Sequence, residues 1–129
     1  MENIRVLINF VFWILLYTFI FSFSQVLLKL GLNQIGTISL KTAQEILPLA
    51  LNIVMNPYVL SGMILLSSSF FIWLAILSWF KLSLALPLVS LSYVLVALLG
   101  FFMLDEKLSF INYFGIILIT AGVFFVVCK

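Results

Sequence analysis

Charged residues divide the chain into long apolar stretches. None occurs from Val6 to Leu28, from Leu82 to Leu104 or from Leu108 to Cys128, and a longer uncharged stretch runs from Ile46 to Phe80. A helix of about 20 apolar residues crosses the hydrocarbon core of a membrane. The pattern therefore predicts an all-α membrane protein, a single domain over residues 1–129 with four transmembrane helices at about 6–30, 58–80, 82–104 and 108–128.

The connectors between the later spans are very short. Lys81 alone separates the second span from the third, and Asp105 to Lys107 separates the third from the fourth. Elements joined by so few residues usually lie side by side. We expect these neighbours to form antiparallel hairpins, with both termini on one side of the membrane.

The first connector is longer and has an amphipathic segment at about 39–55. Apolar residues recur there at helical spacing, and Thr42 to Glu45 has the spacing of a capping box. Asn56 and Pro57 then end the segment before the next span. The sequence predicts a short interfacial helix, either a surface linker that covers the bundle or a contact for lipid or a partner.

Composition strengthens the membrane prediction and excludes several functions. Apolar residues make up 66% of the chain and charged residues 8%, against about a quarter charged in soluble domains. A lone Cys128 and the absence of histidine exclude an intramolecular disulfide and the usual zinc or haem ligands. No acid is paired with a base or nucleophile inside a span, so we expect no enzyme, metal or cofactor. A dispersed net charge of +2 indicates no nucleic-acid partner.

Lysine and arginine do not favour either membrane orientation. Three basic residues fall on each side of the predicted spans: Arg5, Lys81 and Lys129 against Lys29, Lys41 and Lys107. Such a chain could insert both ways and form an antiparallel homodimer. A single orientation fixed by a partner chain, such as a paralogue in a heterodimer, explains the same count.

The first predicted span carries a polar stripe that ends in a cation. Ser22, Gln25 and Lys29 share one helix face. Hydroxyl and amide groups beside an ammonium suit a ligand with a sugar and a phosphate. Alternatively, Ser22 bonds within its own helix, Gln25 bridges to a neighbour, and Lys29 reaches the lipid headgroups.

The third predicted span offers a second polar strip. Pro87 leaves a carbonyl without its helical donor and so predicts a kink, while Ser90 lies on the same face and Tyr93 beside it. This strip could meet the stripe of the first span across a cavity, with Trp73 lining it. Alternatively, Pro87 lies in the first turn of the helix and the serines serve packing.

The fourth predicted span carries Gly115 and Gly122 on one face. Seven residues are close to two helical turns, so both glycines could let another helix approach closely. We expect this face to pack against a second protomer.

Several segments resemble the drug/metabolite transporter superfamily, including its EamA-like and small multidrug resistance-like members. They are Ala85 to Val94, the Glu106 turn with Ser109, and Gly115 to Val123. With Gln25, Lys29 and Trp73 added, the chain is most similar to the small flippase subunits for aminoarabinose linked to undecaprenyl phosphate. The resemblance implies a transporter in the bacterial inner membrane.

Small multidrug resistance transporters rely on a glutamate in the first span, and this chain has none there. With Lys29 as the only expected ion nearby, an anionic ligand fits better than a cation. We therefore expect alternating-access movement of a polyprenyl-phosphate-linked sugar or similar anionic glycolipid, with membrane lipids around the protein. A small multidrug or cation exporter and a non-transporting subunit of a glycosyltransferase complex are the alternatives. The expected substrate-binding residues are Ser22, Gln25, Lys29, Trp73, Pro87, Ser90 and Tyr93.

Overall fold

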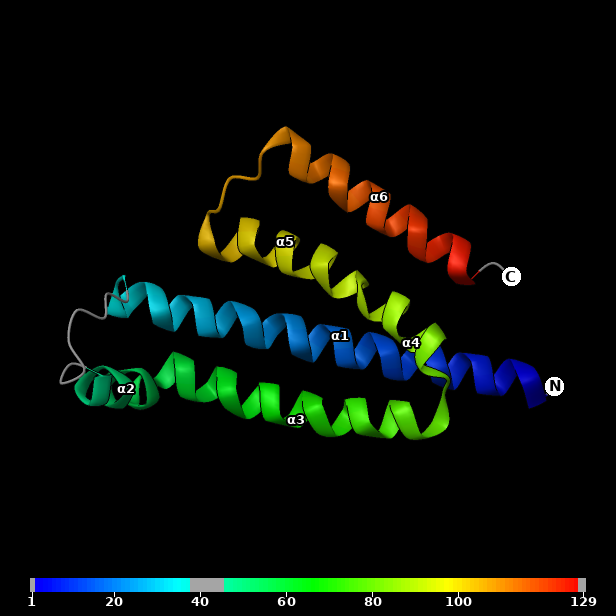
Figure 1. Ribbon diagram of the computed structural model, residues 1–129, viewed down its shortest axis with the longest axis horizontal. Helices are drawn as coiled ribbons and strands as arrows, with labels where there is room; N and C mark the ends of the chain where they lie inside the picture. The colour runs from blue at the N-terminus through cyan, green and yellow to red at the C-terminus, as the bar shows by residue number, and fades with distance from the viewer. Residues whose placement is uncertain (1, 38–45, 128–129) are drawn as a thin grey trace.

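The computed structural model describes residues 2–37 and 46–127, and this part of the chain is helical, with no strand (Figure 1). The predicted capping box at Thr42 to Glu45 lies outside the described residues. The six helices are α1 (Glu2–Ile35), α2 (Ile46–Met55), α3 (Pro57–Trp79), α4 (Leu82–Val89), α5 (Leu91–Leu104) and α6 (Phe110–Val127).

Three helical runs, Ile8–Ile35, Pro57–Trp79 and Leu82–Leu104, are long and apolar enough to cross a membrane. They support a multi-pass membrane protein, as the apolar pattern predicted. The predicted fourth span also forms a helix, α6, but its apolar part is shorter than the three others. Helix α1 begins, and helix α6 ends, at the same end of the molecule (Figure 1).

The centre of the fold is an antiparallel pair formed by α1 and α3. Two glycines allow the close approach of these helices. A Cβ atom at Gly31 would lie 2.5 Å from Val59 Cγ2, and one at Gly62 would lie 2.9 Å from Leu28 Cγ. Helices in a membrane associate through such close packing because the lipid is as apolar as the side chains.

Asn56 caps the first turn of α3 and ties it to α1. Its Oδ1 accepts hydrogen bonds from the backbone N–H groups of Tyr58 and Val59, and its Nδ2 donates to Gln34 Oε1 at 3.1 Å. Gln34 belongs to α1 because that helix continues to Ile35, beyond the predicted boundary near residue 30. Gly36, with a φ of 91°, then ends α1 in a conformation that glycine adopts readily.

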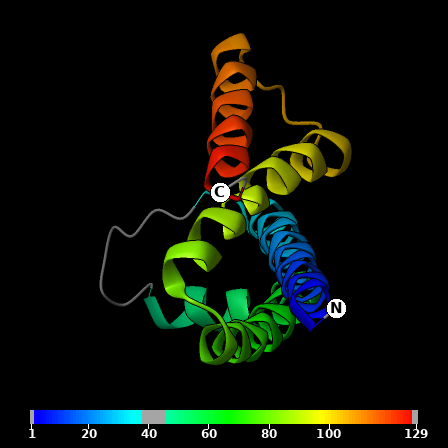
Figure 2. The ribbon, with the colours of Figure 1, turned by 90° about the vertical axis from the view of Figure 1, so that its right-hand side faces the viewer.

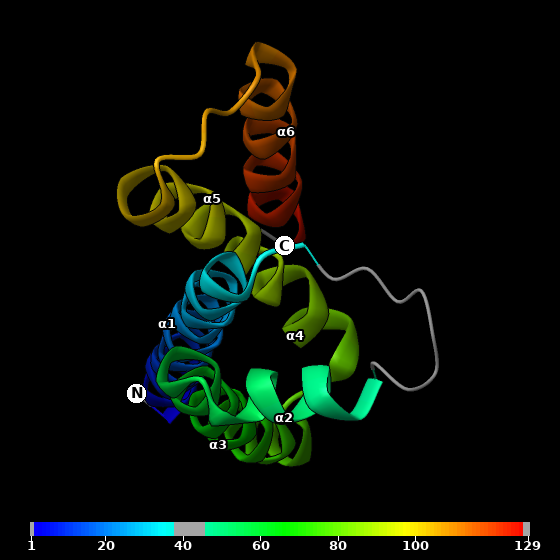
Figure 3. The same ribbon diagram turned by 90° about the vertical axis from the view of Figure 1, so that its left-hand side faces the viewer.

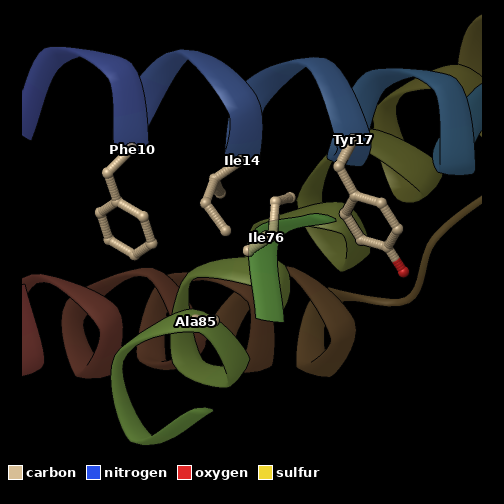
Figure 4. Packing of buried hydrophobic residues seen from close by; sticks show 5 residues of the cluster. All are labelled: Phe10, Ile14, Tyr17, Ile76 and Ala85. Atoms are coloured by element: carbon tan, nitrogen blue, oxygen red, sulfur yellow. The ribbon is translucent and has the colours of Figure 1, made fainter. Parts of the chain in front are cut away.

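A small apolar core joins α1, α3 and α4 near the end that holds the termini. Phe10, Ile14 and Tyr17 point from α1 toward Ile76 of α3 and Ala85 of α4 (Figure 4). Ile76 and Ala85 have no exposed surface. The small side chain of Ala85 thus lets α4 lie close to the first two helices.

The third predicted span is broken into α4 and α5 at Ser90. Pro87 lies inside α4, not in its first turn, so it removes a donor from the helical ladder. The N–H and the hydroxyl of Ser90 both donate to the carbonyl oxygen of Pro87. The local bonds of Ser90 therefore replace the regular helical pattern where α4 ends.

The last helix stands away from the α1–α3 pair. Figures 2 and 3 show α6 rising from the rest of the bundle, where it touches only α4 and α5 among the described helices. The predicted hairpin neighbours α3 and α4 touch, but α3 packs mainly against α1. Figure 3 also shows α2 running across the end of the α1–α3 pair.

Candidate functional site

A cavity of about 300 Å³ with three polar side chains in its wall lies between the later half of α1 and the end of α5. Gln25 and Lys29, two residues of the predicted stripe, line it from α1. Gly100 and Leu104 line it from α5, and Glu106 lines it from the link that leads to α6. The cavity therefore offers an ammonium, an amide and a carboxylate to one ligand.

The ammonium and the carboxylate of this cavity form an ion pair. Lys29 Nζ lies 4.0 Å from Glu106 Oε1, and the two side chains are 53% and 50% exposed. Such a half-exposed pair contributes only about 0.2–1 kcal/mol to stability. The expectation that Lys29 would be the only ion near this site is thus wrong, since Glu106 comes from a distant part of the sequence.

The end of α5 explains how Glu106 reaches the cavity. Asp105 adopts a left-handed conformation with a φ of 54°, and the N–H groups of Asp105 and Glu106 both point to the carbonyl of Gly100. This arrangement closes the end of a helix and reverses the chain. A Cβ atom at Gly100 would lie 3.4 Å from Glu106 Oε2, so the carboxylate lies over this glycine.

The sequence alone suggested a different role for these acids. The range predicted for the fourth span, about 108–128, puts Asp105 and Glu106 just before the start of a helix, where negative charge is favoured. In the structure α6 begins only at Phe110, and both acids belong to the turn that ends α5. Glu106 is therefore the functional candidate that sequence reasoning missed. The polar turn that begins five residues after Gly100, at Asp105, was the available signal.

Ser22 lies apart from the cavity although it shares the stripe with Gln25 and Lys29. It is completely buried, and its Oγ donates to the backbone carbonyl of Ser92 at 3.3 Å. The bond joins α1 to α5. Ser22 thus has the role of a packing contact between helices, and the predicted stripe divides into a structural part and a part that lines the cavity.

Four other predicted site residues are not among those that line this cavity. The ring of Trp73 lies 5.3 Å from that of Tyr17 and packs against the apolar core. Ser90 bonds to Pro87 within its own chain segment. Tyr93 is 63% exposed on α5. Within one chain, the polar strip of the third predicted span therefore does not share the cavity with Gln25 and Lys29.

The glycines on α6 face open space. A Cβ atom at Gly115 or Gly122 would meet nothing within 4 Å. These residues leave room for another helix but contact none in a single chain, so their predicted packing against a protomer stays a prediction. Sequence reasoning missed the two glycines that do pack, Gly31 and Gly62, although glycine within an apolar span is itself a sign of close helix contact.

No group of three or more His, Cys, Asp or Glu side chains gathers in the described ranges to hold a metal ion. Comparison with protein-family models, with curated proteins and with solved structures gives no match for this chain. The resemblance to drug/metabolite transporters therefore stays a prediction, and the function has to be argued from the site itself.

Proposed function

We propose that the protein is a small membrane transporter that moves a polyprenyl-phosphate-linked sugar, or a similar anionic glycolipid, between the two leaflets. One observation carries the proposal. Gln25 and Lys29 line the same half-open cavity beside the later half of the membrane-length helix α1. An ionisable group at such a place is a functional candidate by default, and an ammonium binds phosphate as a point charge.

The size of the cavity suits part of a glycolipid. Ligand pockets commonly range from about 300 to 1,000 Å³, and this cavity of about 300 Å³ is at the lower end. It would hold a phosphate and the nearest part of a sugar. The hydrocarbon chain would stay in the surrounding lipid, which the exposed apolar faces of α5 and α6 would contact.

The proposal includes a fourth membrane span and an interfacial helix. The 18 residues of α6 extend for about 27 Å at the usual rise of a helix, close to the thickness of the hydrocarbon core. Helix α2 lies across the long helices (Figure 3). Its Leu47, Leu51 and Met55 side chains are exposed. Its direction and apolar surface suit the membrane boundary.

Transport would follow from alternating exposure of the Lys29 cavity. The break at Ser90 divides the wall of the bundle into α4, which packs on the core, and α5, which carries Gly100 to the cavity. Movement at such a break changes access without unpacking the core. We place the protein in a bacterial inner membrane as a dimer, either of two copies or with a paralogue, with the open α6 glycine face between protomers.

Flipping measured in proteoliposomes tests the proposal directly. A fluorescent polyprenyl-phosphate sugar should become accessible to an impermeant quencher in vesicles with the protein. Lys29→Ala should reduce the rate about tenfold or more, because charged hydrogen bonds contribute roughly 1.5–3 kcal/mol. Lys107→Ala removes a cation from the exposed link and should leave flipping intact. Undiminished flipping by Lys29→Ala would contradict the proposal.

Export of small cations is a second candidate because Glu106 places a carboxylate in the cavity. A cation would need this group as its counter-charge. An exporter should protect cells from toxic cations in a manner that depends on the pH gradient, and Glu106→Gln should abolish that protection. Resistance without lipid flipping would favour this candidate over the glycolipid.

A further inference from the structure

The two charged groups of the cavity differ in how they are held. Lys29 belongs to α1, whereas Glu106 lies in the link between α5 and α6. The backbone of Glu106 is nevertheless fixed, since its N–H donates to the carbonyl of Gly100 at 3.3 Å. Only the side-chain torsions of Glu106 need to change for its carboxylate to leave the cavity.

We propose that Glu106 is the residue that sets the affinity of this site for phosphate. In the empty site its carboxylate holds Lys29, and the phosphate of a lipid headgroup takes its place when the ligand binds. This inference rests on the proposed function, because it assumes that Lys29 is the group that receives the phosphate. The Glu106 carboxylate then competes with the ligand phosphate for Lys29.

The geometry of the pair favours exchange over a permanent bridge. The one contact is 4.0 Å long and both side chains are about half exposed, so water screens the attraction. A phosphate offers several acceptor oxygens to the three donors of one ammonium. The ligand thus makes the stronger contact with Lys29.

A phosphate cannot simply add to the pair. A carboxylate that remained beside Lys29 would face the incoming anion across a cavity of about 300 Å³, and like charges at such a distance repel. Glu106 lies beyond the membrane-length run Leu82–Leu104, and half of its side chain is exposed, so the displaced carboxylate turns toward water. A ligand with one negative charge then replaces one carboxylate, and the net charge around Lys29 stays the same.

Affinity measurements on the full-length protein in detergent micelles test the exchange. The probes are geranyl phosphate, as a short lipid phosphate, and inorganic phosphate. Glu106→Gln keeps the shape of the side chain but removes the competing charge, so it should tighten geranyl phosphate binding about twofold to fivefold. This increase in affinity should be smaller at high salt.

Asp105→Asn is the matched control. Asp105 carries the same charge on the same link, but it is not among the residues that line the cavity, and asparagine tolerates its left-handed conformation. The affinity of the Asp105→Asn variant for geranyl phosphate should equal that of the unchanged protein. Glu106→Asp gives a second variant in case Glu106→Gln does not fold. Its shorter side chain should hold Lys29 less well and also tighten binding.

The outcomes separate this inference from the function on which it rests. If Lys29→Ala abolishes binding while Glu106→Gln and Glu106→Asp leave the affinity unchanged or lower it, the exchange is wrong and the transporter proposal stands. If Lys29→Ala binds geranyl phosphate normally, the proposed function itself fails. If Asp105→Asn increased the affinity for geranyl phosphate as much as Glu106→Gln, the specific role of Glu106 would be overturned. Equal affinity for inorganic phosphate and geranyl phosphate would overturn the lipid headgroup as the ligand.

Discussion

The α1–α3 pair and the α5–α6 pair each join two apolar helices that run in opposite directions, yet they pack very differently. In the first pair, Gly31 and Gly62 bring the helices so close that a single added carbon would collide with the partner. In the second pair, α6 diverges from α5 (Figure 2). A Cβ atom at Gly115 or Gly122 of α6 would meet nothing within 4 Å.

The difference shows that a small residue produces close helix packing only where another helix lies opposite it. Gly31 faces Val59, and Asn56 fixes the ends of the two helices beside it. Gly115 and Gly122 lie on a helix of similar apolar character without such a partner. The first pair is therefore the rigid part of the protomer, and the second leaves a surface for lipid or another chain.

The largest expected effect comes from filling the close contact of the first pair. Gly31→Ala places a Cβ atom 2.5 Å from Val59 Cγ2 and 2.9 Å from the backbone nitrogen of Val59. The helices must move apart, at a cost of about 1–3 kcal/mol. Gly62→Ala should cost less, because Leu28 can rotate away in part. Thermal unfolding in detergent micelles measures both.

The same substitutions in the second pair provide the control. Gly115→Ala and Gly122→Ala should leave the stability of the protomer unchanged or raise it slightly, since alanine favours a helix more than glycine. Larger residues at these positions should weaken the proposed dimer in cross-linking experiments without unfolding the protomer. A loss of protomer stability with Gly115→Ala as large as that with Gly31→Ala would remove the contrast between the pairs.

The next effect concerns the turn that separates α5 from α6. Asp105 has a φ of 54°, which aspartate tolerates and a β-branched residue does not. Asp105→Val should destabilise the protein by about 1–2 kcal/mol, whereas Asp105→Asn should be nearly neutral. Equal stability of the two variants in chemical unfolding would show that the turn does not constrain the divergence of α5 and α6.

A smaller effect is expected where α1 meets α5. Ser22→Ala removes the hydrogen bond to the carbonyl of Ser92. Hydrogen bonds between membrane helices contribute about 0.6 kcal/mol on average. The free energy of unfolding of this variant should therefore fall by about that amount. Ser78→Ala is a suitable control, because Ser78 bonds only to Ala75 within its own helix. A loss no larger than in the control would show that Ser22 does not hold α5 to the rigid pair.

The smallest effect is expected from the Lys29–Glu106 ion pair. A double-mutant cycle with Lys29→Ala and Glu106→Gln should give a coupling free energy near the lower end of about 0.2–1 kcal/mol, and salt should reduce it. A coupling of several kcal/mol would mean that this pair locks α1 to the α5–α6 link. The second pair would then be as firmly held as the first.

Much of the fold follows from the apolar pattern, because helix length is set by the spacing of charges and turn residues. The spans at about 58–80 and 82–104 closely match α3 and the α4–α5 run. The pattern does not define which helices touch, since nearly every face of these helices is apolar. Contact then depends on where single small residues such as Gly31 and Gly62 face a partner, which requires the three-dimensional arrangement.

Only part of the candidate site could be predicted, because the sequence pattern defines the faces of one helix and not the contacts between helices. Gln25 and Lys29 share a face by helical spacing alone, and the structure brings both to one cavity. Glu106 lies 77 positions from Lys29 in the sequence, and only the left-handed turn at Asp105 returns it to α1. Local spacing contains no information on such a contact.

The cap formed by Asn56 has a consequence for how the chain tolerates change. One side chain binds two backbone groups of α3 and the end of α1, so it sets the register of the two helices at the point where they meet. The connector that precedes α2 is then not needed to align them. Insertions and deletions within residues 38–45 should therefore be accepted without shifting the pairing, and an affinity tag or a reporter domain could be placed there while the protein still assembles.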